Sequence, residues 1–367
     1  MSSALEALLS QSVVVCCGSG GVGKTTTAAA LAVEGARRGR RACVVTIDPA
    51  KRLADALGLA SLTNVASEVK GPWEPPGSLS ALMLDTKSTF DALIATYATS
   101  PSQARTILEN PLYRNIAGAL SGTQEYMAME KLYELVAAAS FDLIVVDTPP
   151  TRNALDFVDA PRRLTRFLDN RVFRLLMMPT RAYLKAVGLA TQTFLRTVSR
   201  VVGSEVVADA VAFFQAFDGM EQGFRDRAAA VQELLRAPGT SFVLVTSPRR
   251  DAVEEATFFA SRLRESAISV DGLIVNRLHP RFGADGAKGA DRADGAVDGE
   301  GVLFDNLRDF EAIASREEQH FAALASRVAP APVARVPFLA DDVHDVEGLV
   351  EVGAHLFGGA PGPSAPG

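Results

Sequence analysis

Cysteine is scarce in this chain of 367 residues, and so are aromatic side chains and long apolar runs. The three cysteines, Cys16, Cys17 and Cys43, all fall in stretches that predict buried strands, where cysteine usually acts as a small hydrophobic residue. Zinc sites in proteins commonly need several thiolate or imidazole ligands. The sequence therefore predicts neither disulfides nor a zinc site.

Histidine is almost as rare, and its occurrences are too scattered for a recognisable metal-ligand spacing. We interpret the histidines as structural or surface residues rather than as ligands of a metal. There are four of them: His279, His320, His344 and His355.

An excess of positive charge and a membrane-spanning run are also missing. The formal net charge is −6, which gives no electrostatic reason to expect a nucleic-acid partner. No apolar run is long enough to span a bilayer, and the N-terminus, MSSALEALLSQ, has neither a basic region nor a small-residue cleavage site. We therefore expect a cytoplasmic protein.

Apolar runs that alternate with helical stretches fill most of the chain. Its residues are 48% hydrophobic but only 7% aromatic, a balance that suits a sheet covered by helices. Apolar runs separated by helices are typical of βαβ units, so the sequence predicts an α/β fold with a mostly parallel sheet of about seven or eight strands. Strands are expected near residues 12–17, 42–47, 80–84, 142–146, 241–245, 272–275 and 333–336.

One long segment interrupts this alternation. Residues 161–236 show no strand pattern but carry apolar residues at helical spacing, including Leu164 and Phe213. We interpret the segment as a helical lobe inserted into the sheet domain, which then consists of residues 1–160 and 237–357. Such a lobe is a candidate for binding a client or partner.

Composition also marks two flexible stretches and one basic stretch. Residues 281–301 are rich in Gly, Ala and Asp and residues 358–367 in Gly and Pro, so we expect a mobile loop and a disordered tail. Residues 151–200 hold ten Arg or Lys against three Asp. A solvated outer face of core helices is the first interpretation, and a docking face that includes Met177, Met178 and nearby phenylalanines is the alternative.

The strongest motif is a glycine loop at residues 18–25, GSGGVGKT, which fits the pattern G-x-x-x-x-G-K-[ST] and lies between an apolar strand and an Ala-rich helix. Glycines let backbone N–H groups turn toward phosphate oxygens, and a helix N-terminus attracts anions. Lys24 would reach the β- and γ-phosphates, and Thr25 would hold Mg²⁺ through its hydroxyl. An ordinary glycine-rich turn is the alternative. The residues expected to contact nucleotide here are Gly20, Gly21, Val22, Gly23, Lys24, Thr25 and Thr26.

Carboxylates follow two of the predicted strands, Asp48 the second and Asp147 the fourth. Ligands bind at the C-terminal edge of an open parallel sheet, so both residues should converge with Lys24 and Thr25 on one site. Asp147 is expected at Mg²⁺, directly or through a water, which leaves Asp48 for the attacking water. For either residue alone, a cap or turn former is the alternative interpretation.

With these motifs the chain resembles the arsenite-pump and tail-anchored-protein-targeting ATPase family, a branch of the P-loop proteins. Residues 18–26 resemble the family pattern GKGGVGKTT, residues 48–56 its switch I pattern DPAHNLSDA, and residues 147–158 its switch II pattern DTAPTGHTLRFL. The resemblance covers nearly the whole chain. It implies ATP and Mg²⁺ as ligands, a nucleotide-gated dimer, Asp48 as the residue that positions the hydrolytic water, and Asp147 as the sensor of the γ-phosphate and Mg²⁺.

Two later segments resemble the family's base-binding residues. Val275-Asn276-Arg277 is similar to a strand end whose Asn hydrogen-bonds adenine, which implies that role for Asn276. Val336-Pro337-Phe338-Leu339 is similar to the segment that walls the base, which implies that Pro337 and Phe338 contact it.

The chain departs from the family at positions that matter for partners and substrates. Ser19 stands where the family has a signature lysine that reaches across the dimer to the partner's phosphates. The stretch after Asn276 lacks the Cys-x-x-Cys pair that bridges a dimer through zinc in the targeting ATPases. No cysteine outside the predicted strands is available to bind arsenite as in the pump subunits. These departures put the family's best-known substrates in doubt, but not nucleotide binding.

Residues 122–130 precede a predicted helix, with Thr123 as its N-cap. In the family the corresponding segment lies near the switches. We interpret Glu125 as a solvated carboxylate at the start of the helix, where acids are favoured, and keep a contact with the site as the alternative.

Together these features predict a Mg²⁺-dependent ATPase whose nucleotide cycle gates a dimer and the binding of a client or partner by the helical lobe. A hydrophobic protein or a membrane partner is the expected class. The dimer is a homodimer, or a heterodimer with a paralogue that carries the signature lysine. The alternatives are a non-hydrolysing regulatory subunit, the soluble ATPase subunit of an anion pump, and a biosynthetic or partitioning P-loop protein, against which the long insertion argues.

Overall fold

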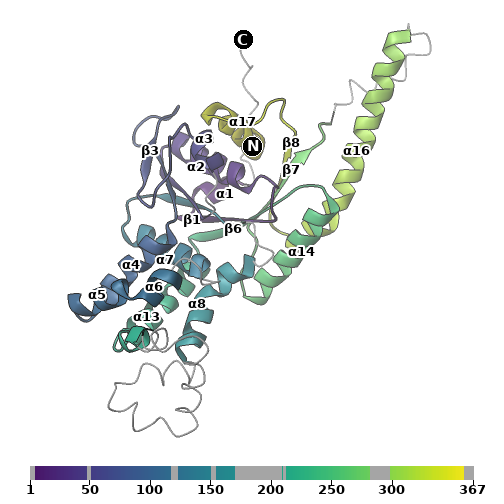
Figure 1. Cartoon of the computed structure of the whole chain (residues 1–367). Coiled ribbons are helices and arrows are strands. Elements are labelled where there is room, and N and C mark those ends of the chain that lie inside the picture. Colours follow the sequence, from purple (N-terminus) through teal and green to yellow (C-terminus); the bar gives the residue numbers. More distant parts are fainter. Residues whose placement is uncertain are drawn as a thin grey trace. The chain divides into compact units, whose positions relative to one another are not determined.

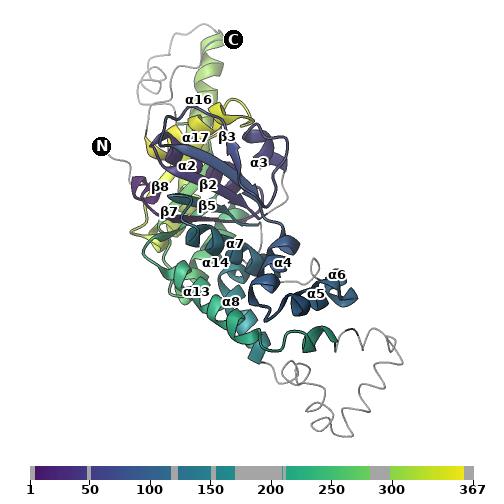
Figure 2. The same cartoon turned by 90° about the vertical axis from the view of Figure 1, so that its left-hand side faces the viewer.

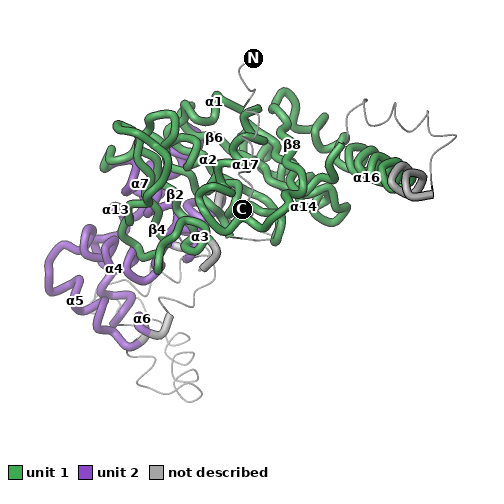
Figure 3. The backbone as a smooth tube through the Cα atoms, turned by 90° about the horizontal axis from the view of Figure 1, so that it is seen from above, with its two compact units in different colours: residues 1–83, 138–154, 238–367 green, residues 84–137, 155–237 purple. Residues whose placement is uncertain are grey.

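The computed structural model describes residues 5–47, 51–116, 123–149, 154–169, 209, 212–281 and 298–358. The chain divides into two compact units, coloured separately in Figure 3. The first, here called the sheet unit, comprises Met1–Met83, Ala138–Ala154 and Pro238–Gly367. The second, the helical unit, comprises Leu84–Ala137 and Leu155–Ala237.

Eight strands form one sheet in the order β3-β4-β2-β5-β1-β6-β7-β8, and every neighbouring pair is parallel except β3 with β4. The predicted α/β fold with a mostly parallel sheet is therefore confirmed. The strands are β1 (Val13–Cys17), β2 (Arg41–Thr46), β3 (Ser67–Val69), β4 (Ser78–Met83), β5 (Leu143–Asp147), β6 (Thr240–Thr246), β7 (Gly272–Leu278) and β8 (Val333–Pro337).

The central strands consist of apolar residues because both of their faces are covered. All five residues of β1 and all five of β5 are buried, as expected for parallel strands between two layers of helices. The strand missing from the sequence-based prediction is β3, since three residues, Ser-Glu-Val, are too short and too polar to form an apolar run.

Helices cover both faces of the sheet. They are α1 (Glu6–Leu9), α2 (Lys24–Arg37), α3 (Lys51–Ala56), α14 (Arg250–Glu265), α16 (Asp298–Val328) and α17 (Val346–Phe357). Figures 1 and 2 show α2 and α17 on one face and α14 on the other. Helix α2 lies in the connection from β1 to β2, and α14 lies in the connection from β6 to β7. These two connections run in opposite directions along the sheet, so right-handed crossovers place the two helices on opposite faces.

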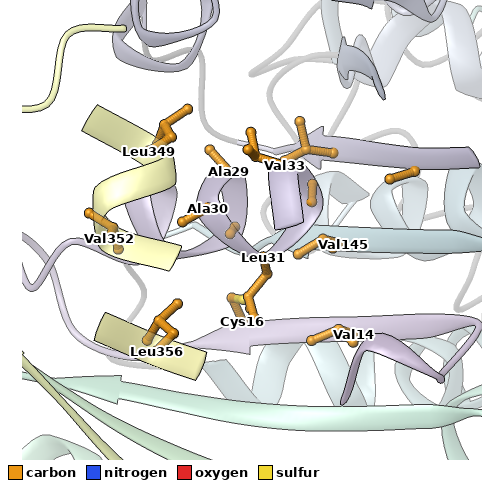
Figure 4. Packing of buried hydrophobic residues seen from close by; sticks show 14 of the residues in the cluster. Val14, Cys16, Ala29, Ala30, Leu31, Val33, Val145, Leu349, Val352 and Leu356 are labelled. Carbon is orange, nitrogen blue, oxygen red and sulfur yellow. The ribbon is translucent and has the colours of Figure 1, made fainter. Parts of the chain in front are cut away.

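Small residues bring α2 close to the sheet and to α17. In Figure 4, Ala29 and Ala30 of α2 lie beside Leu349 and Val352 of α17, and side chains of β1 and β5 lie beneath. A Cβ added to Gly35 would come within 2.6 Å of the Leu143 side chain, so α2 approaches β5 closely. This packing holds the first turn of α2 at the edge of the sheet where β1 ends.

The predicted mobile loop at 281–301 is wrong in its last residues. Helix α16 begins at Asp298, so residues 298–301 form its first turn. Acidic residues, here Asp298 and Glu300, favour a helix N-terminus, a local preference that the composition argument overlooked. Residues 282–297 lie outside the described part of the chain, as do residues 359–367 of the predicted tail.

The helical unit contains α4 (Thr86–Tyr97), α5 (Pro101–Glu109), α6 (Pro111–Ile116), α7 (Thr123–Ala137), α8 (Ala154–Asp169) and α13 (Glu221–Arg236). It includes residues 84–137, which the sequence analysis had assigned to the sheet domain. Helices separate successive strands throughout such a fold, so a pattern along the chain does not reveal which of them leave the sheet to form a second core. Much of the predicted lobe at 161–236, including Met177 and Met178, lies outside the described residues.

An aromatic cluster forms the core of the helical unit. The ring of Phe213 lies 5.0 Å from that of Phe217 and 6.0 Å from that of Tyr113. Phe217 contacts Phe224, which in turn contacts Tyr97. Because Phe213 and Phe217 are buried, they belong to this core. Across the described ranges no helix is long and apolar enough to cross a membrane.

Candidate functional site

The glycine loop connects β1 to α2 at the C-terminal edge of the sheet, in the sheet unit. Strand β1 lies between β5 and β6, and the chain continues from it toward β2 on one side and, later, toward β6 and β7 on the other. Open parallel sheets bind ligands at such a point, where the strand order reverses.

Two glycines in this loop occupy positions that no other residue fits. A Cβ on Gly18 would lie 2.1 Å from the carbonyl oxygen of Val245 in β6. Gly23 has a left-handed backbone, with φ of 91°, and its Cβ would lie 2.2 Å from the side-chain nitrogen of Asn276. The loop is therefore packed against β6 where it leaves β1 and against β7 where it enters α2.

Lys24 folds back over the loop that precedes it. The residue begins α2 and is only 6% exposed, and its Nζ donates a hydrogen bond of 2.7 Å to the carbonyl oxygen of Ser19. This arrangement holds a buried ammonium group across the glycine loop, at a helix N-terminus that already favours anions. Gly20 and Gly21 are exposed, Val22 is buried, and Thr26 is half-buried in the first turn of α2.

Asp147 joins the loop to the neighbouring strands. Its carboxylate lies at the end of β5, is 1% exposed, and accepts hydrogen bonds from the hydroxyls of Thr25, at 2.7 Å, and Thr46, at 3.1 Å. Thr46 ends β2 and is paired in register with Asp147. The structure thus brings together Lys24, Thr25 and Asp147, as the sequence predicted, and adds Thr46.

This donor set suits Mg²⁺ with a phosphate ligand. Hydroxyl and carboxylate oxygens are ligands for a hard cation, and Mg²⁺ usually takes only one or two protein ligands beside phosphates and water. Within the part of the chain that the structure describes, no group of three His, Cys, Asp or Glu side chains is placed to hold a metal by itself. Thr25 and Asp147 would hold Mg²⁺, which when bound neutralises charge on the phosphates.

Asp48 lies outside the described residues, so its position stays a prediction. The residue before it, Ile47, donates its backbone N–H to the carbonyl oxygen of Asp147 at 3.2 Å. The chain therefore passes directly beside Asp147 where it leaves β2.

The predicted base-binding residues lie at the ends of β7 and β8. Phe338 follows β8, is 52% exposed, and donates its backbone N–H to Leu278 at 2.8 Å, while Pro337 ends the strand. Asn276 donates from its side chain to the carbonyl oxygen of Val22 at 3.0 Å, which places it against the glycine loop. A contact of Asn276, Pro337 and Phe338 with a base stays a prediction.

The cysteines lie in β1 and β2, where all three are buried and none forms a disulfide. Burial, and then the charge of Asp147, raises the pKa of the Cys16 thiol well above its ordinary value. Burial raises the pKa of Cys17 to about 12. Thiols of this kind stay protonated at neutral pH and are poor ligands for soft metals.

Other polar residues singled out in the sequence have structural contacts. The His279 ring lies 2.7 Å from the carboxylate of Glu317, and the His320 ring lies 3.1 Å from the carbonyl oxygen of Pro248. Glu125 lies in the first turn of α7, in the segment expected to precede that helix. Glu125 is half-buried, and one of its carboxylate oxygens is buried without a hydrogen-bond partner among the described atoms, so both its solvated role and a contact with the site stay predictions.

Comparison with known proteins gives the family. The sequence profile of the anion-transporting ATPases matches residues 11–289, which span the glycine loop, Asp147 and Asn276. The chain belongs to this family of ATPases. The resemblance seen in the motifs is thereby confirmed.

Relatives in this family are distant in sequence. ATPase GET3B of Arabidopsis thaliana is 27% identical over 285 residues, which cover 73% of this chain and 64% of that protein, just under two thirds. ATPase GET3 of Malassezia globosa is 26% identical over 265 residues, 72% of each chain. A putative arsenical pump-driving ATPase of Aquifex aeolicus is 22% identical over 354 residues, 95% of this chain and 79% of that one.

Two residues of the site escaped the sequence analysis. Thr46 precedes Ile47 in an apolar strand, and a single hydroxyl there carries no motif. Arg277, next to Asn276, donates to the carbonyl oxygen of Gly21 at 2.9 Å. In the sequence, only the family pattern connects β7 with the nucleotide site. That pattern assigns Asn276 to the base and not to the glycine loop.

Proposed function

We propose that this chain binds Mg²⁺-ATP at the glycine loop and hydrolyses it in a cycle that opens and closes a dimer. The observation that carries the proposal is the hydrogen bond of 2.7 Å between the hydroxyl of Thr25 and the carboxylate of Asp147. It joins the end of the phosphate-binding motif to a buried acid on the neighbouring strand. This pairing is the one that Mg²⁺-dependent phosphoryl transfer needs.

Each residue has a distinct task in this proposal. Lys24 binds the β- and γ-phosphates with its ammonium group, and the backbone amides of residues 20–26 surround the phosphate oxygens. Thr25 and Asp147 hold the metal ion, and Asp48 orients the attacking water and accepts its proton. Asn276, Pro337 and Phe338 contact the base.

Equilibrium binding tests the assignment. We expect ATP to bind the full-length chain in a Mg²⁺-dependent manner by isothermal titration calorimetry, and Lys24→Ala to bind it on the order of 100-fold more weakly or worse, because the phosphates lose their principal side-chain cation. Undiminished affinity in that variant, with both proteins folded by circular dichroism, contradicts the site.

Ser19 favours a second candidate function. Its hydroxyl is buried and has no hydrogen-bond partner among the described atoms, and it brings no charge to the loop. A homodimer of this chain would have two sites that both lack the lysine of the family pattern. We propose a heterodimer with a lysine-bearing paralogue, in which this chain either hydrolyses ATP with the partner's help or serves as a non-hydrolysing regulatory subunit. ATP turnover alone and with the paralogue separates these outcomes.

The helical unit is the proposed binding region for a client. Its support is the family, since the relatives named above include two GET3-type ATPases and a putative arsenical pump-driving ATPase. The proposed partner is a hydrophobic protein client or a membrane partner, and the proposed location of this chain is the cytoplasm. Against the arsenical alternative stand the three buried cysteines, which offer no accessible thiolate.

A further inference from the structure

Strand β7 carries one extra residue beside the glycine loop. Its pairing with β8 is regular up to Val275, which lies opposite Arg335, and resumes at Leu278, which lies opposite Pro337. Two residues of β7, Asn276 and Arg277, therefore occupy the length of one residue in β8. Such a bulge bends a strand and changes the direction of its side chains, and bulges are common next to active sites.

The backbone at the bulge is strained. Arg277 has a φ of 61°, which lies in the left-handed region of backbone conformation. Residues other than Gly, Asn and Asp rarely adopt this conformation. The side-chain oxygen of Asn276 accepts the Arg277 N–H at 2.9 Å and so holds this conformation. Residues other than glycine keep a left-handed backbone only when surrounding contacts impose it, and such residues cluster at functional sites.

The bulge directs two consecutive side chains to the same loop. In a regular strand, neighbouring side chains point to opposite faces. Here Asn276 donates to the carbonyl oxygen of Val22 at 3.0 Å, and Arg277 donates to that of Gly21 at 2.9 Å. Gly23 leaves the space that Asn276 occupies, since a Cβ there would lie 2.2 Å from its side-chain nitrogen.

These two hydrogen bonds set the direction of the peptide groups that follow each carbonyl. A trans peptide is planar, with its C=O and N–H on opposite edges. When the carbonyls of Gly21 and Val22 face β7, the N–H groups of Val22 and Gly23 face the opposite side of the loop. Those N–H groups belong to the row of amides that surrounds phosphate in this motif.

We propose that the Asn276–Arg277 bulge is a positioning device that presets the phosphate-binding amides of the glycine loop. Arg277 also brings a permanent positive charge to a loop in which Ser19 stands at the position of a lysine. Both residues thus act on the phosphates through the loop, whatever contact Asn276 makes with a base. This inference rests on the proposed ATP site.

The test separates phosphate binding from base binding. The probes are ATP and inorganic tripolyphosphate, which has no base, with affinities measured by calorimetry on the full-length chain. Arg277→Gly keeps the left-handed backbone without strain and removes the guanidinium. We expect it to weaken both ligands by the same factor, on the order of 10-fold, and to lower kcat/KM through KM. Arg277→Lys should restore part of the affinity.

The matched control is Arg335→Ala on the neighbouring strand, whose exposed guanidinium pairs with Glu318 and not with the loop. Melting temperatures, compared with that of the wild type, show whether each variant is folded. Unchanged affinities in Arg277→Gly, a loss confined to ATP, or wild-type binding of ATP without tripolyphosphate overturns the positioning role. Failure of the wild type to bind ATP overturns the proposed function instead.

Discussion

Asp147 is the residue at which most contacts of the candidate site meet. It accepts from Thr25 and Thr46, and its backbone carbonyl accepts from Ile47, the last described residue before Asp48. A buried carboxylate is expensive unless hydrogen bonds or a cation compensate its charge. Two hydroxyl donors supply part of that compensation. In the proposed function, a metal ion held by Thr25 and Asp147 would supply the rest, and Asp48 would act on water.

Replacement of Asp48 tests that division. Asp48→Asn should retain ATP and Mg²⁺ but slow turnover by about 10² to 10⁴-fold, the usual effect of losing a positioned proton acceptor. Calorimetry gives the affinity and phosphate release gives the rate. Equal losses of affinity and rate would instead assign Asp48 to the metal.

Thiol reactivity tests the buried cysteines. A raised pKa leaves the thiol protonated at every pH below it, so at pH 8 the thiolate fraction of Cys17, with its pKa of about 12, is negligible. We expect iodoacetamide to label no thiol in the native chain and three after denaturation, and we expect arsenite not to stimulate hydrolysis. Rapid labelling of Cys16 or Cys17 in the native protein would refute this.

At the scale of elements, the glycine loop is a structure imposed by its neighbours. Gly18 is required by the nearby carbonyl of Val245, and Gly23 by Asn276. Both contacts come from strands more than two hundred residues later in the sequence, β6 and β7. The shape of the loop therefore depends on its packing against the sheet.

Gly23→Ala should show this dependence. The added Cβ would overlap the side chain of Asn276 in a left-handed backbone, so we expect ATP affinity to fall by about 10- to 100-fold. Gly58→Ala is the matched control, since Gly58 also has a left-handed backbone, with φ of 66°, but nothing lies within 4 Å of its Cβ position. Similar ATP affinities in the two variants would mean that the loop does not need this contact.

The buried ion pair of the helical unit offers a stability test. Glu130 of α7 is 4% exposed and pairs with Arg227 of α13, whose guanidinium also lies over the Tyr133 ring at 3.9 Å. Arg227→Ala would leave a buried carboxylate unpaired, so we expect a loss of about 2–3 kcal/mol in the free energy of unfolding, near the lower range for such pairs.

Urea denaturation followed by circular dichroism measures this loss, with Arg225→Ala as the control on the same helix. Arg225 pairs with the more exposed Asp169, so its removal should change stability by about 1 kcal/mol or less. Equal effects of the two substitutions would show that the Glu130 pair does not stabilise the unit.

Elements were predictable wherever a local pattern determined them. Strands β1, β2, β5 and β6 are continuous apolar runs, and the loop motif predicts both its own position and the start of α2. Three features were missed by the sequence analysis. The strand β3 is too short, α16 begins inside a stretch of low apolar content, and the bulge at Asn276 depends on pairing with β8.

At the scale of the whole molecule, the chain combines a sheet unit that carries the candidate site with a helical unit that has its own aromatic core. The chain passes from the sheet unit to the helical unit directly after β4 and again shortly after β5, the strand that ends at Asp147. Residues 147–158, which resemble switch II, span one of these connections. Six residues, 148–153, separate Asp147 from the start of α8 in the sequence.

Ser19 gives the prediction that belongs to the assembly. The chain alone should turn over ATP slowly, and Ser19→Lys, or addition of a lysine-bearing paralogue, should accelerate it by about 10³ to 10⁵-fold, the effect of a cation supplied to a transferring phosphate. Steady-state phosphate release measures the rates, and sedimentation measures the dimer. If the wild-type chain alone is as fast as either, the lysine is dispensable and the heterodimer proposal fails.

Single-turnover hydrolysis tests the central claim most directly. Excess full-length chain is mixed with a limiting amount of ATP, with Mg²⁺ or with a chelator, and phosphate is measured over time for the wild type and for Lys24→Ala. We predict phosphate release that requires Mg²⁺ and is lost in Lys24→Ala. Release at equal rates in both proteins, or no release from the wild type when all the Mg²⁺-ATP is bound and the paralogue is present, would contradict an ATPase built on Lys24, Thr25 and Asp147.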